Sequence, residues 1–227
     1  MKANYPTSIE KINERKQKIK LLDKKKWLKS KARFSGSQLL IGGLVAMSSW
    51  EKPYMKRLAE IAALNGGKIL EIGFGMGLAS NFIEHHKIVS HTIIEPHPDV
   101  VKKAVEWKNL QKHPERIKII KGFWQDVAGD FKDGEFDGIL FDTYPMTEKE
   151  IHRNHFPFLK YAHRLLKKGG ILTYYSDEVK DFSGEHLSVL KKAGFSSIKA
   201  YVCRVKPPKN CEYWEHKTIV APEIRKT

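Results

Sequence analysis

The sequence predicts an α/β fold in which a mostly parallel β-sheet carries helices on both faces. Apolar runs of strand length alternate with helical stretches from residue 68 to about residue 205, which is the pattern of a doubly covered parallel sheet. A glycine-rich turn joins the first of these strands to a helix, as in open sheets that bind ligands at the carboxyl ends of their strands. The 227 residues suffice for one full core. We expect residues 1–64 to form a helical segment or lid and residues 65–227 to form the sheet domain.

The first 33 residues are strongly basic. They hold 12 Lys or Arg against 3 Asp or Glu, in a chain whose net charge is +15. Such a block either binds nucleic acid or an anionic surface, or is the solvated face of a lysine-rich helix; we favour the second interpretation. The helix is expected to begin near Tyr5 and to carry Trp27 as one anchoring aromatic.

Residues 47–55 lie just ahead of the predicted sheet and lead into a helix at residues 56–64. They place one acid, Glu51, among aromatic residues and methionines. Two interpretations stay open. The segment forms a lid over the glycine-rich turn, or it is a helix N-terminus, where the helix dipole favours an acid.

The glycine-rich turn, residues 73–77, follows the predicted strand at residues 68–72. Its glycines alternate as G-x-G-x-G, unlike the G-x-G-x-x-G of dinucleotide sites. Glu71 comes just before the turn. Glu95, 22 residues after Gly73, ends the next strand, where a carboxylate can accept both ribose hydroxyls. These residues predict a nucleoside-cofactor site; the alternative is a turn that needs glycine for packing only.

Apolar runs place the remaining strands and helices. The strands are expected at residues 88–95, 116–121, 136–141, 171–175, 198–205 and 213–221, and the helices at 78–83, 98–110, 154–166 and 186–193. After the strand at 116–121, Phe123 or Trp124 can stack on an adenine ring, and Gln125 or Asp126 can bond its exocyclic amine. This stretch therefore predicts the base-binding part of the cofactor site.

Asp142 ends the strand at 136–141, at the same sheet edge as the other predicted site residues. A group that is protonated at pH 7 must lose its proton before its lone pair can react, so it needs a nearby base. Asp142 and Glu51 could together grip a planar guanidinium through charge-assisted hydrogen bonds. An acidic pair is thus suited to hold a cation and to accept its proton.

Several stretches resemble guanidinoacetate N-methyltransferase, from about residue 40 to the C-terminus. They are Trp50-Glu51-Lys52-Pro53-Tyr54-Met55, Glu71-Ile72-Gly73-Phe74-Gly75-Met76, Gly122-Phe123-Trp124-Gln125-Asp126, residues 136–145 ending in Asp142-Thr143-Tyr144-Pro145, residues 169–174, Pro207-Pro208 and Cys211-Glu212-Tyr213. The glycine motif is shared by many methyltransferases. Trp50-Glu51 together with Asp142-Thr143-Tyr144-Pro145 is much more specific.

The resemblance implies a Rossmann-like seven-stranded methyltransferase sheet, mostly parallel with an antiparallel C-terminal strand, and an N-terminal helical cap. It implies S-adenosyl-L-methionine as cofactor and S-adenosyl-L-homocysteine as product, with Asp142 accepting the guanidino proton and Glu51 pairing the guanidinium. The cofactor contacts that we predict are Met47, Tyr54, Glu71, Gly73, Phe74, Gly75, Gly77, Glu95, Pro96, Gly122, Phe123, Trp124, Gln125 and Asp142. The acceptor contacts that we predict are Trp50, Glu51, Asp142, Tyr144, Ser176 and Asp177.

The stretch Tyr175-Ser176-Asp177-Glu178 departs from the family pattern, in which this region helps to bind the acceptor's carboxylate. Two acids there would repel a carboxylate. The departure favours an acceptor that lacks the carboxylate or carries an added amine. The expected activity is therefore N-methylation of a small guanidino compound.

Two other functions stay open. The family includes fungal enzymes that methylate arginine in proteins, and the basic N-terminus is compatible with a protein or nucleic-acid substrate. Alternatively, the chain is a cofactor-binding fold kept as an interaction module, although its two acids argue against that.

Other features predict little further chemistry. Cys203 and Cys211 lack metal or redox spacing, and His152, His155 and His163 lack the partners of a metal site; His155 near the acceptor pocket is a further possibility. No apolar run approaches a membrane span, and no signal-peptide core follows the start. We expect a cytoplasmic monomer or homodimer without a membrane partner.

Overall fold

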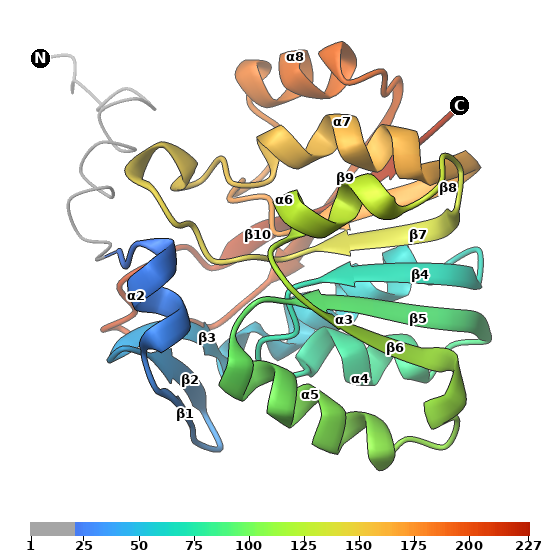
Figure 1. The fold of residues 1–227 in the computed structure, drawn as a ribbon. Coiled ribbons are helices and arrows are strands. Elements are labelled where there is room, and N and C mark those ends of the chain that lie inside the picture. The colour runs from blue at the N-terminus through green and yellow to red at the C-terminus, as the bar shows by residue number, and fades with distance from the viewer. Residues whose placement is uncertain (1–20) are drawn as a thin grey trace, which may run out of the picture.

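A seven-stranded sheet organises the part of the chain that the computed structural model describes, residues 21–227. The expected helix start near Tyr5 lies outside these residues. The strand order is β6-β5-β4-β7-β8-β10-β9 (Figure 1). The strands are β4 (Gly67–Ile72), β5 (Ile88–Glu95), β6 (Ile117–Lys121), β7 (Phe136–Phe141), β8 (Leu166–Tyr174), β9 (Ser197–Arg204) and β10 (Thr218–Arg225). Strands β4 to β8 pair in parallel, whereas β10 runs antiparallel to both β8 and β9, which confirms the predicted fold class.

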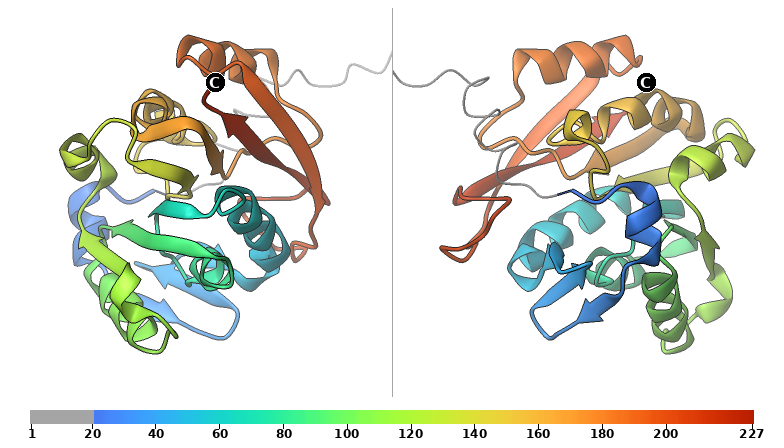
Figure 2. Two further views of the ribbon diagram at one scale, coloured as in Figure 1. Left: turned by 90° about the vertical axis from the view of Figure 1, so that its right-hand side faces the viewer. Right: turned by 60° about the vertical axis from the view of Figure 1, so that its left-hand side comes forward.

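Helices cover both faces of this sheet, as the alternation of strands and helices predicts. One face packs against α3 (Lys52–Ala62), α4 (Leu78–Glu84) and α5 (Pro98–Asn109), and the other against α6 (Trp124–Val127), α7 (Phe156–Leu165) and α8 (Gly184–Lys192). Figures 1 and 2 show the two layers from three directions. Alternate residues of one strand serve different faces: Ile69 lies in the core beneath α3, whereas Leu70 lies in the core beneath α7. Short 3-10 turns at Pro114–Arg116, Ala128–Asp130 and Glu148–Glu150 join some of these elements. Among the described residues, no helix is both long and apolar enough to cross a bilayer.

Two strands differ from the sequence prediction by more than one residue. Strand β8 begins at Leu166 rather than at residue 171, because the chain passes directly from α7 into the sheet. Gly169 donates its backbone N–H to Lys226 O, which extends the pairing with the end of the chain. The last strand covers residues 218–225 rather than 213–221. Residues 206–217 instead form a loop that carries Tyr213 to the site described below.

The region before the sheet is not an all-helical cap. It contains the short helix α2 (Lys24–Lys29), then a three-stranded antiparallel sheet of β1 (Ala32–Phe34), β2 (Gln38–Ile41) and β3 (Leu44–Ser48), and a 3-10 turn at Ser49–Glu51. Gly42 and Gly43, with φ of 59° and 83°, form the tight turn between β2 and β3. This antiparallel sheet lies at the carboxyl ends of the parallel strands (Figure 1).

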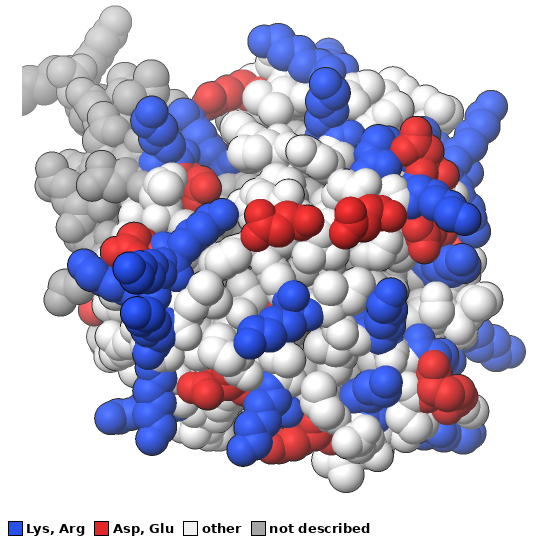
Figure 3. Space-filling view, in the orientation of Figure 1, with Lys and Arg blue, Asp and Glu red and all other residues white. Residues whose placement is uncertain are grey.

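Helix α2 separates its basic and apolar faces. Its lysines are exposed, and Figure 3 shows Lys and Arg side chains gathered over this helix. Trp27, in contrast, is 4% exposed and joins the core beneath β1–β3. For residues 24–29 this is the arrangement expected of a solvated lysine-rich helix with one anchoring aromatic.

Candidate active site

A cavity of about 390 Å³ opens at the carboxyl edge of the parallel strands, the edge at which open α/β sheets bind ligands. Its size falls within the range of small-molecule sites, roughly 300–1,000 Å³. We distinguish two parts. The glycine-turn half is lined by Met47, Gly73, Gly75, Glu95, Pro96, Phe123, Trp124 and Gln125. The acidic half is lined by Glu51, Asp142, Tyr144, Glu150, His152, Tyr175, Asp177, Glu212 and Tyr213.

The turn after β4 leaves its backbone open to close approach. Gly73 has φ of 91°, and a Cβ atom there would overlap the carbonyl oxygen of Asp142. Gly75 has φ of 55°, and a Cβ there would lie 2.8 Å from the Met47 sulfur. Both positions therefore require glycine, for conformation and for space. The result is a cavity wall made of main chain.

Glu95 ends β5 and faces this wall. Its Oε2 accepts a hydrogen bond from Phe74 N at 3.0 Å, and its Oε1 accepts one from His97 N at 2.8 Å. Burial raises the pKa of Glu95 to about 7, although these backbone donors oppose the shift. The backbone fixes the carboxylate at the cavity surface, and its remaining lone pairs can accept hydroxyl donors.

Phe123, Trp124 and Gln125 line the same half from the start of α6. The Trp124 ring packs edge-on against Phe141 and Phe158, at ring-centroid distances of 5.9 and 5.2 Å. This packing holds one apolar wall in place, as a site for a planar base requires. Asp126 of the same stretch is not part of the lining.

Glu71 does not line the cavity. It accepts a hydrogen bond from Ser80 Oγ at 2.6 Å and pairs with His91 Nε2 at 2.8 Å. His91 Nδ1 in turn pairs with Glu84, which also binds Arg116. Burial by itself would lower the pKa of His91, but its two glutamate partners raise it. Glu71 thus belongs to a buried network between β4, α4 and β5 rather than to the predicted cofactor contacts.

Glu51 is the most tightly held acid of the acidic half. Its Oε1 accepts hydrogen bonds from Ser48 N and from Tyr213 Oη, each at 2.7 Å. Burial raises its pKa to about 8, and the negative charge of Asp142 adds to the shift. Glu51 also forms a capping box with Ser48 at the 3-10 turn, which agrees with the interpretation as a helix N-terminus, and it lines the cavity.

Asp142 follows β7 directly, and its backbone N–H donates to Ile72 O at 2.9 Å. Among the described residues, none donates a hydrogen bond to its carboxylate. Burial raises its pKa to about 7, with further contributions from the charges of Glu71 and Asp177. The structure therefore brings Glu51 and Asp142 together, as predicted, and both carboxyls hold protons unusually tightly. A bound cation would favour their ionised forms.

Two predicted acceptor residues lie in loops of the acidic half. Tyr144 stacks on Trp27 at a centroid distance of 4.6 Å. Asp177 pairs with His152, Oδ1 to Nδ1, at 2.9 Å. The pair turns the Asp177 charge towards a partner that the sequence did not predict.

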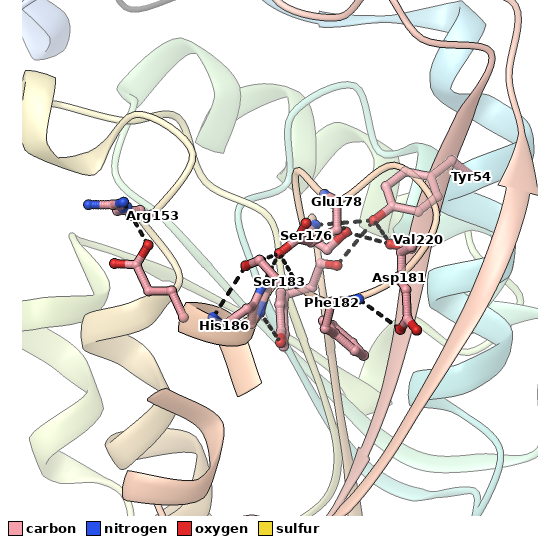
Figure 4. Close-up of polar contacts among 11 residues, drawn as sticks. Tyr54, Arg153, Ser176, Glu178, Asp181, Phe182, Ser183, His186 and Val220 are labelled. Carbon is pink, nitrogen blue, oxygen red and sulfur yellow. Dashed lines mark hydrogen bonds and ion pairs between the residues drawn. The ribbon is translucent and has the colours of Figure 1, made fainter. Parts of the chain in front are cut away.

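Three predicted contacts lie behind the cavity wall instead of on it. Tyr54 is fully buried; its Oη donates to Val220 O at 2.9 Å and accepts from Ser176 N (Figure 4). Ser176 Oγ donates to Val220 O at 2.6 Å, so this hydroxyl ties the β8 end to β10. Trp50 stacks on Tyr213 and lines a neighbouring groove. The structure gives these three side chains supporting positions.

A further set of predicted residues is also absent from the lining. Phe74 packs on Trp107 at 5.4 Å, and Gly77 starts α4 in a left-handed conformation. Gly122 precedes α6. His155 is stacked on Tyr174 in the core, where burial lowers its pKa well below the usual value.

The sequence did not predict Tyr175, Tyr213 and Trp27 as residues that line the cavity. His152 was considered only as a metal ligand. Tyr213 lies in a stretch that carried the family resemblance, and this was the available signal. Among residues 21–227, no group of three His, Cys, Asp or Glu side chains is arranged to hold a metal ion.

Comparison with known proteins agrees with this geometry. The family model described as "Guanidinoacetate N-methyltransferase" matches residues 22–227. Protein arginine N-methyltransferase 2 of Kluyveromyces lactis is 39% identical over 105 residues, which are 43% of this chain and 25% of that protein. The Saccharomyces cerevisiae protein of the same name is 33% identical over 138 residues, 57% of this chain and 32% of that protein. The matched segments thus span a quarter to a third of these relatives.

Solved structures share the fold at low sequence identity. Spermidine synthase from Thermotoga maritima aligns with a TM-score of 0.57 and 17% identity, over 87% of this chain and 72% of that chain. At this identity the likeness concerns the fold alone, and it agrees with the seven-stranded sheet and its antiparallel C-terminal pair.

Proposed function

We propose that this chain, which belongs to the guanidinoacetate N-methyltransferase family, transfers a methyl group from S-adenosylmethionine to a guanidino nitrogen of a small molecule. One observation carries the proposal. Glu51 and Asp142 line one cavity, and burial raises the pKa of Glu51 to about 8 and that of Asp142 to about 7. A bound cation would stabilise the ionised form of both carboxyls, and a planar guanidinium matches a carboxylate pair in shape and charge.

The residues of the glycine-turn half fit the cofactor. Glu95 would accept its ribose hydroxyls, the backbone at Gly73 and Gly75 would lie against its amino-acid part, and Phe123, Trp124 and Gln125 would hold the adenine. Gly73 and Gly75 line the cavity and carry no side chain, so a ligand could approach their backbone closely. When bound, the cofactor supplies an electrophilic methyl group.

Glu51 and Asp142 have different roles. Glu51 already accepts two hydrogen bonds, so it is fixed and orients the guanidinium. No described residue donates to the Asp142 carboxylate, which is free to accept a guanidinium N–H. Transfer of that proton to Asp142 leaves a lone pair on the guanidino nitrogen, directed at the methyl group. The raised pKa of Asp142 makes it a stronger base than an exposed aspartate.

The experiment is a turnover screen with methyl-labelled S-adenosylmethionine and the full chain. The acceptors are guanidinoacetate, arginine, several alkylguanidines and an arginine-rich protein extract. We expect labelled product from a small guanidine. Labelled macromolecule without any small product would contradict the proposed acceptor class and leave the reaction type standing.

Arginine in a protein is the second candidate acceptor. The observation that favours it is the name shared by the curated relatives, protein arginine N-methyltransferase 2. Exposed lysines on α2 could help to bind an acidic macromolecule (Figure 3). The same screen separates the two candidates, and loss of macromolecular labelling at high salt would indicate electrostatic docking.

A further inference from the structure

We infer that Tyr175, His152 and Asp177 form a second subsite, which binds an ammonium group at the far end of the guanidino acceptor. This inference rests on the proposed function and specifies its substrate class: an alkylguanidine that ends in an amine rather than in a carboxylate. All three residues line the acidic half of the cavity.

The pair of His152 and Asp177 joins two loops in an unusual backbone conformation. Their side chains are 11% and 15% exposed, with 2.9 Å between Nδ1 and Oδ1. His152 has φ of 61° and Asp177 has φ of 57°, values that residues other than glycine seldom adopt. Such conformations cost free energy and cluster at functional sites, where the surrounding structure imposes them.

Contacts on both sides of Asp177 impose its conformation. Ser176 Oγ accepts from Glu178 N at 3.1 Å, and Glu178 O accepts from Val220 N at 2.8 Å. The Glu178 carboxylate also binds Ser183, as Figure 4 shows. Ser176 and Glu178 are therefore held by hydrogen bonds within the protein, whereas Asp177 lines the cavity.

Three polar atoms of the subsite lack partners. Among the described residues, none hydrogen-bonds to Tyr175 Oη or His152 Nε2, although both atoms are buried. Asp177 bonds His152 through Oδ1, and no described residue donates to its Oδ2. When Asp177 accepts from Nδ1–H, the neutral imidazole presents Nε2 as an acceptor. Buried polar atoms without partners are costly, so a ligand that donates to Tyr175 Oη and His152 Nε2 would relieve that cost, and Asp177 Oδ2 is a third acceptor beside them.

The charge of the cavity lining determines which class of ligand could donate hydrogen bonds to these atoms. Its lining contains six acids and, among the described residues, neither Lys nor Arg. The acids are Glu51, Glu95, Asp142, Glu150, Asp177 and Glu212. A carboxylate would meet acceptors and negative charge with no cation to pair with. An ammonium group has three N–H donors and a positive charge, which matches three acceptor atoms in an acidic wall.

The two subsites lie in one cavity, which limits the length of the acceptor. The Asp177 charge is close enough to raise the pKa of Asp142, of Glu51 and of Tyr175. The ammonium subsite therefore lies within the same cavity as the guanidinium subsite. The test below uses a linker of a few methylene groups.

The test compares three guanidines of equal length. They are 4-aminobutylguanidine, pentylguanidine and 5-guanidinopentanoate, which end in an ammonium, a methyl and a carboxylate group. Binding to the full chain is measured by calorimetry with S-adenosylhomocysteine present, so no turnover is needed. We expect the amine to bind at least about tenfold more tightly than pentylguanidine, and the carboxylate to bind most weakly.

Two variants identify the residues responsible. In Asp177→Asn the preference for the amine over pentylguanidine should fall to within about threefold. The preference is a ratio measured within one variant, so a change in guanidinium binding that both ligands share does not alter it. Asn tolerates the left-handed conformation well, so this change removes charge and keeps the backbone. Tyr175→Phe should reduce the same preference by a smaller factor. Asp181→Asn, on the same loop but outside the cavity, is the matched control and should leave the preference intact.

The possible outcomes distinguish a failure of the ammonium subsite from a failure of the proposed small-molecule function. If pentylguanidine or the carboxylate binds as tightly as the amine, the ammonium subsite is wrong although the guanidino site stands. If the preference survives in Asp177→Asn, the assigned residues are wrong. If none of the three guanidines binds, the proposed small-molecule function fails, and the subsite fails with it.

Discussion

The glycine-turn half and the acidic half of the cavity are built in different ways. The first consists of main chain and of side chains at the ends of neighbouring parallel strands, such as Gly73 after β4 and Glu95 at the end of β5. The second depends on pairs far apart in the chain: Glu51 binds Tyr213, 162 residues away, and His152 binds Asp177 across 25 residues. A short motif can encode the first half. The second half exists only once the whole fold has formed, and its loops can change without disturbing the first.

Replacing Asp142 by Asn should have the largest effect, confined to the acidic half. Loss of the base is expected to lower turnover by about 10²–10⁴-fold. The affinity for S-adenosylhomocysteine should change by less than about threefold, as measured by calorimetry. Full turnover in Asp142→Asn would contradict the role proposed for this residue.

Glu95→Gln should affect the glycine-turn half alone. The amide keeps an oxygen for one backbone N–H but loses the charge that would accept the ribose hydroxyls, so cofactor affinity should fall by about 10–100-fold. At saturating cofactor, turnover and the acceptor KM should change little. A changed acceptor KM with normal cofactor affinity would show that the two halves are not separate.

The affinity for guanidines should rise with pH. The pKa of Glu51 is raised to about 8 and that of Asp142 to about 7, so at pH 6 both carry protons that a bound guanidinium must displace. Affinity should therefore increase by about tenfold or more between pH 6 and pH 8. Calorimetry in buffers of different ionisation enthalpy should detect proton release at pH 7. An affinity independent of pH would mean that these carboxyls are not the guanidinium site.

Glu51→Gln should make the free protein slightly more stable at high pH. The folded protein holds the Glu51 proton more tightly than the unfolded chain does, whose ordinary pKa is 4.5, so stability falls as pH rises from 4.5 towards about 8. Glutamine avoids that loss and can still accept from Ser48 and Tyr213. We expect the melting temperature to rise by roughly 3–8 °C at pH 8.5 and hardly at all at pH 5. An equal gain at both pH values would exclude this electrostatic cause.

The sequence predicted features that depend on local motifs better than features that depend on pairs far apart in the chain. The seven-stranded sheet, the glycine turn and the position of Glu95 follow from local patterns that the structure reproduces. The antiparallel sheet β1–β3 was expected as helix, although two short apolar runs around Gly42-Gly43 carry the signal of a hairpin. The facing positions of His152 and Asp177 could not be predicted, because they depend on left-handed backbone in two separate loops. Tyr54, on α3, and Ser176, shortly after β8, lie behind the cavity wall; this was not predicted, because sequence alone does not show which face of a helix or which side of a strand end borders a cavity.

The stack of Trp27 on Tyr144 connects helix α2 to the acidic half of the cavity. Trp27 also lies edge-on to His97, next to Glu95, and α2 is tied down by the hydrogen bond between Ser30 O and His97 Nε2. The same indole thus lines the cavity next to residues of both halves. We expect its fluorescence to report the filling of either half, and the release of S-adenosylhomocysteine to slow when an acceptor occupies the other. Equal release rates with and without an acceptor would show that the Trp27–Tyr144 contact does not couple the two halves.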